Sequence, residues 1–298
     1  MRQQFAKTVY DTLSSDSSAA ILIGDISHYL LRETEEDFPN RFYNMGICEQ
    51  SMVGMAAGLS IGGIRPIVHT ITPFCVERAF EQIKIDVSYQ NLPVSIVTVG
   101  ASFDYASLGC THHCYEDIAL MRTLPNVQVF VPGSSKEFDN LFKESWKQKT
   151  PNYFKLTTKE HSLGDVSGGI GGLVHIKKSN SHRTVIVCGH LVDDVLESGI
   201  DCNVLYTASM TGLSKDSLET LSKNVGRETH LYVVEENSVV GGLGDAILES
   251  ISCNNFHMPA RFKRLGIPVK WLTNYGKASE HREALGLTPK GIREAIDV

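Results

Sequence analysis

Short strand-like segments alternate with longer helix-like segments along the chain, and this alternation constrains the fold more than any other feature. The apolar runs 19–24, 65–69 and 94–100 are short and continuous, which is typical of strands buried on both faces. Between them, 50–61 is rich in small and apolar residues, and 75–89 carries apolar residues at three- and four-residue spacing. The pattern predicts an α/β fold in which a mostly parallel β-sheet is flanked by helices.

This pattern stops at a glycine-rich stretch and then starts again. Five glycines lie between Lys159 and Arg183, and polar residues surround them. Further strand-like runs occur on both sides of the stretch, at 127–131, 152–156, 184–189, 203–206 and 230–235. We therefore expect two domains, each with its own sheet, at residues 1–160 and 183–298, joined by a linker at 161–182.

Charge and cysteine usage exclude several classes of protein. The chain has 28 Lys and Arg against 34 Asp and Glu, a formal net charge of −6, which gives no general attraction to nucleic acid or to an anionic membrane. No stretch approaches the ~20 apolar residues of a membrane helix. The seven cysteines are scattered without a CxxC pair, which indicates free thiols in a reducing compartment, so we expect a cytoplasmic protein.

Glu49 is the strongest candidate for acid–base chemistry. It closely precedes the run 51–60, which is apolar or small, so its carboxyl group is expected at the first turn of a buried helix. Desolvation of a carboxyl group raises its pKa and prepares it to exchange protons. A helix-terminal Glu that is stabilised only by the helix dipole is an equally good interpretation of these local features.

The run Cys110-Thr111-His112-His113-Cys114 contains residue types that bind zinc. Five consecutive residues do not readily bring four side chains around one tetrahedral ion, and the sequence has no second Cys/His pair at zinc-finger spacing. We therefore expect no metal-binding residues in this chain.

Five segments together carry a family resemblance. They begin with Asn44-Met45-Gly46-Ile47-Cys48-Glu49-Gln50, and they lie at 44–60, 73–83, 109–119, 122–126 and 233–244. In sequence and order they resemble the thiamine-diphosphate enzymes of the transketolase type. The first four resemble the pyrimidine-binding domain of that family, and the last resembles its C-terminal domain.

The resemblance implies a role for four residues at the cofactor. Glu49 would hydrogen-bond N1′ of the thiamine pyrimidine and promote its imino tautomer, which requires a carboxyl group that holds or shares a proton. Phe74 would pack against the aminopyrimidine ring. Asp25 and Ile71 would lie near the cofactor. A core position for Phe74 and a helix-capping role for Asp25 are the alternatives.

The same resemblance implies that His112 lies at the substrate. An imidazole there can donate a hydrogen bond to an oxygen of the substrate or move a proton, so His112 is expected to be catalytic and substrate-binding. His113 is expected to bind substrate, with a packing or interface role as the alternative.

The diphosphate half of the site is missing from the sequence. The family binds the diphosphate through Mg²⁺ with a Gly-Asp-Gly motif, whereas Gly-Asp occurs here only at Gly24, Gly164 and Gly244, never followed by glycine. The resemblance also starts at the pyrimidine-binding domain. It therefore implies a split enzyme with an α2β2 assembly, in which the diphosphate and Mg²⁺ are held by a separate N-terminal transketolase subunit.

The substrate side departs from sugar-phosphate transketolases. Leu108 stands where those enzymes carry an Asp, Gly100 where they carry a His, and Thr158 where they carry a phosphate-binding Arg. Such polar contacts discriminate strongly between substrates. Asp104 or Tyr105 is expected to replace the lost contacts, and pyruvate or another small 2-oxo acid is a possible donor besides a sugar.

The expected function is that of the C-terminal subunit of a two-subunit transketolase-like enzyme. It would transfer a two-carbon ketol or acyl unit between sugars or 2-oxo compounds by means of thiamine diphosphate. Two alternatives stay open. One is the β subunit of a 2-oxoacid decarboxylase or dehydrogenase complex, and the other is a non-catalytic regulatory homologue.

Overall fold

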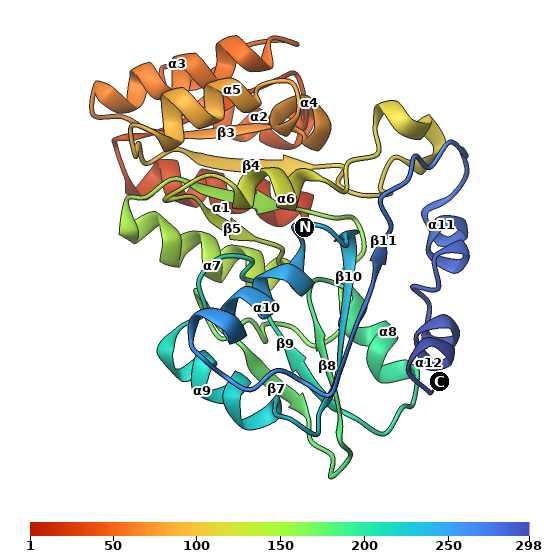
Figure 1. The fold of residues 1–298 in the computed structure, drawn as a ribbon. Coiled ribbons are helices and arrows are strands. Elements are labelled where there is room, and N and C mark those ends of the chain that lie inside the picture. Colours follow the sequence, from red (N-terminus) through yellow and green to blue (C-terminus); the bar gives the residue numbers. More distant parts are fainter. Residues whose placement is uncertain (298) are drawn as a thin grey trace.

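The computed structural model describes residues 1–297 of the chain, and its N-terminal part is built on a six-stranded parallel sheet (Figure 1). The strand order is β2-β1-β3-β4-β6-β5, and every neighbouring pair is parallel. The strands are β1 (Ala19–Ile23), β2 (Phe42–Asn44), β3 (Arg65–Ile71), β4 (Ser95–Val99), β5 (Gln128–Phe130) and β6 (Asn152–Lys155).

Helices cover both faces of this sheet because its strands are apolar on both faces. In β1, Ile21 and Ile23 join one apolar core, which also contains side chains of α1 and α7, whereas Leu22 joins a second core with side chains of α3. The helical segments are α1 (Arg2–Ser15), η1 (His28–Leu31), α2 (Arg32–Asp37), α3 (Glu49–Ile61), α4 (Thr72–Val76), α5 (Phe80–Gln82), η2 (Ile83–Ser88), η3 (Ala106–Thr111), α6 (Asp117–Arg122) and α7 (Ser135–Gln148). The predicted α/β class is confirmed.

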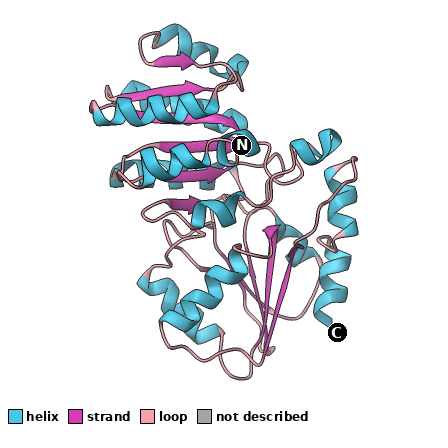
Figure 2. Ribbon diagram, turned by 45° about the horizontal axis from the view of Figure 1, so that its top comes forward, coloured by secondary structure: helices cyan, strands magenta, loops and turns pink. Residues whose placement is uncertain are grey.

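A second sheet has five strands in the order β11-β10-β8-β9-β7, of which only β7 is antiparallel to its neighbour. In Figure 2 its strands run in a different direction from those of the first sheet, with helices around both sheets. Its elements are β7 (Val174–Lys177), β8 (Arg183–Val187), α8 (Leu191–Glu197), β9 (Asn203–Tyr206), α9 (Lys215–Asn224), β10 (His230–Ser238), α10 (Leu243–Cys253), β11 (Arg261–Ile267), α11 (Ala278–Ala284) and α12 (Pro289–Asp297).

The segment 161–182, expected to be a linker, contains the strand β7. This strand pairs with β9, so the polypeptide has already joined the second sheet before residue 183. The division of the chain into domains at 160 and 183 stays a prediction.

The run 75–89 is not one continuous helix. It is divided into α4, α5 and the π-helical η2, with a break at Ala79, whose φ of −106° and ψ of 21° are not helical. The apolar spacing of this run indicates which side chains face the core, but it does not determine which backbone groups pair. A π-helical turn keeps an apolar face while its hydrogen bonds change register.

Two general features complete the fold. No helix among residues 1–297 is both long and apolar enough to cross a lipid bilayer. The carboxyl ends of β1, β2, β3 and β4 lie along one edge of the first sheet, because these four strands are adjacent and parallel. Open α/β sheets bind ligands at the carboxyl ends of their strands, so a ligand-binding site is expected along this edge.

Candidate active site

Asp25 connects two loops at the carboxyl edge of the first sheet. It lies two residues after the end of β1, and its side chain is exposed. Its backbone is left-handed, with a φ of 58°. The Asn44 amide group donates a hydrogen bond to the Asp25 carboxylate at 3.2 Å, and the Asn44 side-chain oxygen accepts one from the Gly46 amide at 3.1 Å. Asp25 therefore holds the loop that leads to Glu49, rather than capping the next helix, for which no side-chain bond is present in the described residues.

Glu49 is the first residue of α3 and is almost completely buried, with 1% of its surface exposed. Its carboxylate is paired: Arg78 Nη1 donates to it at 2.7 Å. The Arg78 side chain is 43% exposed, so the pair lies between the protein interior and the open face. No role for Arg78 was predicted from the sequence. The signal was a single arginine within the segment 75–89, at a position that the resemblance already covered.

Phe74, on α4, lies between Arg78 and His112. The Arg78 guanidinium carbon is 4.6 Å from the centroid of the Phe74 ring, and the His112 ring meets Phe74 edge to face at 5.2 Å. Phe74 is half-buried, unlike its fully buried neighbours Cys75 and Val76. Ile71, the last residue of β3, is 8% exposed directly before α4.

His112 is half-buried at the end of η3 and is oriented by neighbouring side chains. The Thr111 hydroxyl shares a hydrogen bond of 2.9 Å with His112 Nδ1, and the Tyr105 ring meets the imidazole edge to face at 5.9 Å. Tyr105 lies against Gly100, where a side-chain carbon would come within 2.1 Å of the tyrosine ring. Glycine at position 100, with a φ of 74°, therefore makes the space that Tyr105 occupies.

Two expected substrate-binding residues are engaged elsewhere. His113 is 5% exposed and packs against Phe103 and His281, and burial together with the neighbouring His281 lowers its pKa. Asp104 accepts hydrogen bonds from the Thr158 amide at 2.9 Å and from the Thr158 hydroxyl at 2.7 Å, while burial raises its pKa. The structure thus brings together Glu49, Phe74, Tyr105 and His112, but it packs His113 and Asp104 behind them. Their roles at the substrate stay predictions.

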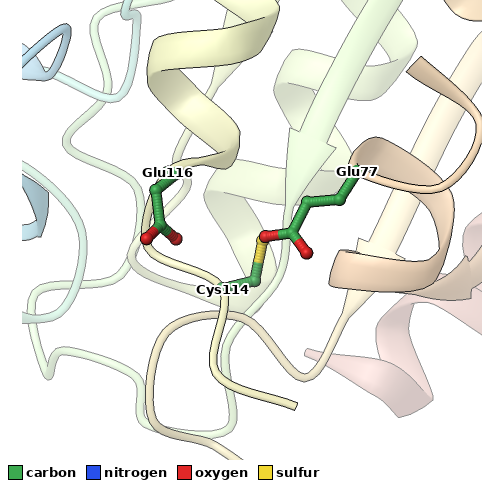
Figure 3. Close-up of side chains that lie close together, drawn as sticks. All are labelled: Glu77, Cys114 and Glu116. Atoms are coloured by element: carbon green, nitrogen blue, oxygen red, sulfur yellow. The ribbon is translucent and has the colours of Figure 1, made fainter. Parts of the chain in front are cut away.

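Cys114 belongs to a small cluster with Glu77 and Glu116, shown in Figure 3. The three potential ligand atoms lie within 4.8 Å of one another, and the Cys114 thiol donates to Glu77 at 3.4 Å. Burial raises the pKa of the Cys114 thiol well above its usual value, and burial also raises the pKa of both carboxyl groups. The Cys114 thiol is therefore a hydrogen-bond donor within this cluster. Cys110, by contrast, is exposed, so the run 110–114 does not converge on one point.

The group formed by Glu49, Phe74, Tyr105 and His112 fits one half of a thiamine cofactor, its aminopyrimidine ring. A buried carboxyl group that holds or shares a proton can hydrogen-bond a ring nitrogen of an aminopyrimidine, and the adjacent Phe74 ring offers an aromatic face for stacking. The residues present therefore fit the pyrimidine. The sequence offers no Gly-Asp-Gly motif for the diphosphate.

Two family models match this chain. Residues 2–163 match the family model "Transketolase, pyrimidine binding domain", and residues 180–292 match "Transketolase, C-terminal domain". A solved structure described as "Split gene transketolase, inactive beta4 tetramer" is 28% identical with a TM-score of 0.83, over 99% of this chain and 96% of that one.

Two curated relatives have a similar extent. One of the subunits of the apulose-4-phosphate transketolase of Actinobacillus succinogenes is 30% identical over 241 residues, which cover 78% of this chain and 76% of the relative. An uncharacterized 33.6 kDa protein in the fasciation locus of Rhodococcoides fascians is 29% identical over 296 residues, covering 98% and 92%. The chain therefore belongs to the transketolase family, in which it matches the pyrimidine-binding and C-terminal domains.

Proposed function

We propose that this chain is the C-terminal subunit of a two-subunit, thiamine-diphosphate-dependent transketolase that transfers a two-carbon ketol or acyl unit. The observation that carries the proposal is the buried Glu49 carboxylate beside the half-open rings of Phe74 and His112, at the carboxyl edge of a parallel sheet. A non-catalytic homologue has no requirement to keep a buried carboxyl group and a half-buried aromatic ring together at this edge. The non-catalytic alternative is therefore weaker.

Each of these side chains has a separate task in the proposed site. Glu49 holds a proton at the ring nitrogen of the pyrimidine, and Phe74 orients that ring by stacking. When bound, thiamine diphosphate supplies the nucleophilic carbon and the electron sink for cleavage of a bond next to a carbonyl group. In the chain alone, the Arg78 guanidinium is hydrogen-bonded to the Glu49 carboxylate. When the pyrimidine binds, this guanidinium has to move away or share the carboxyl group with the pyrimidine.

His112 acts at the substrate. Its Nδ1 is already engaged with the Thr111 hydroxyl, which leaves Nε2 to face a substrate oxygen. Hydrogen-bond donors aimed at an oxygen that gains charge stabilise the transition state. Leu108, which stands where sugar-phosphate transketolases carry an Asp, is 49% exposed and offers only apolar surface. This favours a donor with fewer hydroxyl groups, and pyruvate or another small 2-oxo acid is the donor class we propose alongside a ketose.

The proposed partner is an N-terminal transketolase subunit that holds the diphosphate and Mg²⁺. Two observations support it: the missing Gly-Asp-Gly motif, and the similar solved structure, which is described as an inactive assembly of β chains. An α2β2 assembly would then be the active form. We propose the cytoplasm as its compartment, because all seven cysteines are free.

Co-purification and reconstitution test this proposal. The chain is recovered from extracts of its native cells with Mg²⁺ and thiamine diphosphate present, and the co-purifying chain is identified and expressed with it. We expect a partner with a Gly-Asp-Gly motif, cofactor bound only by the complex, and two-carbon transfer only by the complex. Tight cofactor binding and turnover by this chain alone would contradict the half-site, and a complex with no cofactor would favour the non-catalytic alternative.

A further inference from the structure

The loop 100–115, which carries Tyr105 and His112, lies against the C-terminal part of the chain. In Figure 1 it is the yellow segment beside the blue connection between β11 and α11. The Ser102 hydroxyl donates to the backbone oxygen of Glu236 at 2.6 Å, and the Ser238 amide donates to the Tyr115 carbonyl at 2.8 Å. The His112 loop is thus attached to β10 at both of its ends.

A buried ion pair fixes helix α11 to the same strand. Arg282 donates to the Glu236 carboxylate through both Nε and Nη2, the latter at 3.1 Å, and both side chains are largely buried. A planar guanidinium that binds a carboxylate through two bonds has little freedom to turn. The pair therefore determines where the preceding residue, His281, meets the loop.

His281 packs into the loop through ring contacts. It is 7% exposed, stacks nearly parallel on Phe103 with centroids 4.8 Å apart and an angle of 8°, and meets His113 edge to face at 5.1 Å. Phe103 in turn meets His113 at 5.5 Å and 90°. Three rings from two distant segments therefore support one another, and one of them is the immediate neighbour of His112.

The ring nitrogens are not the source of this contact. Neither nitrogen of His113 nor Nε2 of His281 has a hydrogen-bond partner in residues 1–297. What joins the three side chains is one stacked and two edge-to-face ring contacts, which contribute orientation as well as buried area.

On these contacts we infer that His281 is a positioning residue, which holds the His112 loop in its working geometry by stacking on Phe103 and by meeting His113 edge to face. This inference rests on the proposed function for its effect on catalysis, but the positioning itself is a property of the chain alone. It gives the C-terminal part of the chain a direct influence on the substrate side of the proposed site.

The test compares His281→Ala, which removes the ring, with His281→Phe, which keeps a ring without nitrogens. In the chain alone, labelled with ¹³C in the histidine rings, the His112 signal is identified from its loss in His112→Asn. We expect the His112 signal to shift in His281→Ala and to stay near its normal position in His281→Phe. The exposed His182 provides the control, His182→Ala, which should leave it unchanged.

In the complex with its partner, we expect His281→Ala to lower kcat about 10- to 100-fold at unchanged affinity for thiamine diphosphate, with His281→Phe restoring most of it. If His281→Ala fails to fold, Arg282→Lys, which keeps the charge but loses the two-bond geometry, should shift the same signal. An unchanged His112 signal in the ring-deleted variant overturns the inference. Loss of kcat in His281→Phe equal to that in His281→Ala overturns it too. Absence of transfer by the unaltered complex contradicts only the proposed function.

Discussion

The guanidinium of Arg78 is hydrogen-bonded at 2.7 Å to the carboxylate of Glu49, and the two side chains differ sharply in exposure, 43% against 1%. A pair with one buried and one accessible member can open without moving the buried group. We therefore expect the Arg78 side chain to move when a ligand binds the carboxyl group, while α3 keeps Glu49 in place.

Replacing Glu49 with Gln should abolish two-carbon transfer by the complex while leaving assembly intact. Glutamine keeps the size of the side chain but cannot hold and release the proton, and a loss of at least about 100-fold in turnover is expected. Turnover at saturating cofactor, together with gel filtration, checks this. The matched control is Glu33→Gln on the exposed part of α2, which should behave as the unaltered protein. Full activity of the complex with E49Q would favour the alternative that this chain is a non-catalytic homologue.

Replacing Phe74 with Leu should weaken cofactor binding by the complex. Leucine keeps apolar volume but removes the aromatic face, and the geometric part of an aromatic contact corresponds to roughly a tenfold change in affinity. Calorimetric titration of thiamine diphosphate in the presence of Mg²⁺ measures it. Tyr29→Leu, at a side chain that is 82% exposed, serves as the control. An unchanged Kd in F74L would mean that this ring does not contact the cofactor.

The fold could be predicted because its signal is local. Ile21, Leu22 and Ile23 are apolar on both faces of one strand, and a strand of this kind requires layers on both sides. The π-helical turn at 83–88 could not be predicted, because apolar spacing does not encode the register of backbone hydrogen bonds.

The residues of the candidate site could be proposed in part, through the resemblance of short segments. Glu49, Phe74 and His112 lie within those segments, and the structure brings them to one edge. The partners Arg78 and His281 were missed because their roles depend on tertiary contacts, with Glu49 and Phe103 respectively. Nothing in the local sequence around His281 indicates that the ring of Phe103 will stack there.

Replacing Lys155 with Met should destabilise the protein strongly. Lys155 and Asp117 are both almost fully buried, 2.8 Å apart, and Lys155 also donates to the Asn237 side chain at 2.8 Å. Removing the lysine leaves Asp117 as an uncompensated buried charge, which costs about 3–5 kcal/mol. The free energy of unfolding in urea measures the effect.

A double variant separates the charge from the packing at this position. Adding Asp117→Asn to Lys155→Met should recover part of the lost stability, because it removes the unpaired charge. Lys143→Met, at an exposed pair with Asp139 one helical turn away, should change stability by only about 0.5 kcal/mol. Equal losses of unfolding free energy in K155M and K143M would show that the buried pair stabilises the fold no more than the exposed pair does.

His69 should make the protein less stable as the pH falls below 6.5. It is fully buried on β3, shares a 2.8 Å hydrogen bond with the Val97 carbonyl and a 2.9 Å hydrogen bond with the Ser27 hydroxyl, and stacks on Phe5. Because Arg2 donates to Ser27, the serine proton is free to point at His69, which suits a neutral imidazole. Burial lowers its pKa from 6.5 to about 3.

The sign of this effect follows from proton binding. Between pH 6.5 and 3 the unfolded chain binds a proton at His69 and the folded chain does not, so the stability from this group is complete above pH 6.5 and is lost as the pH falls. The slope is at most about 1.4 kcal/mol per pH unit. Urea unfolding is measured between pH 7 and 5, above the range in which Glu236 acts. Burial alone would raise the pKa of Glu236, but His190 and Arg282 outweigh it and lower that pKa to about 2. His69→Gln should reduce the slope of the profile in that range, part of which comes from His113, whose pKa is also lowered by burial. His182→Gln, at an exposed position, should leave the slope unchanged. A profile that is already flat in the unaltered protein would show that His69 takes up its proton without cost to the fold.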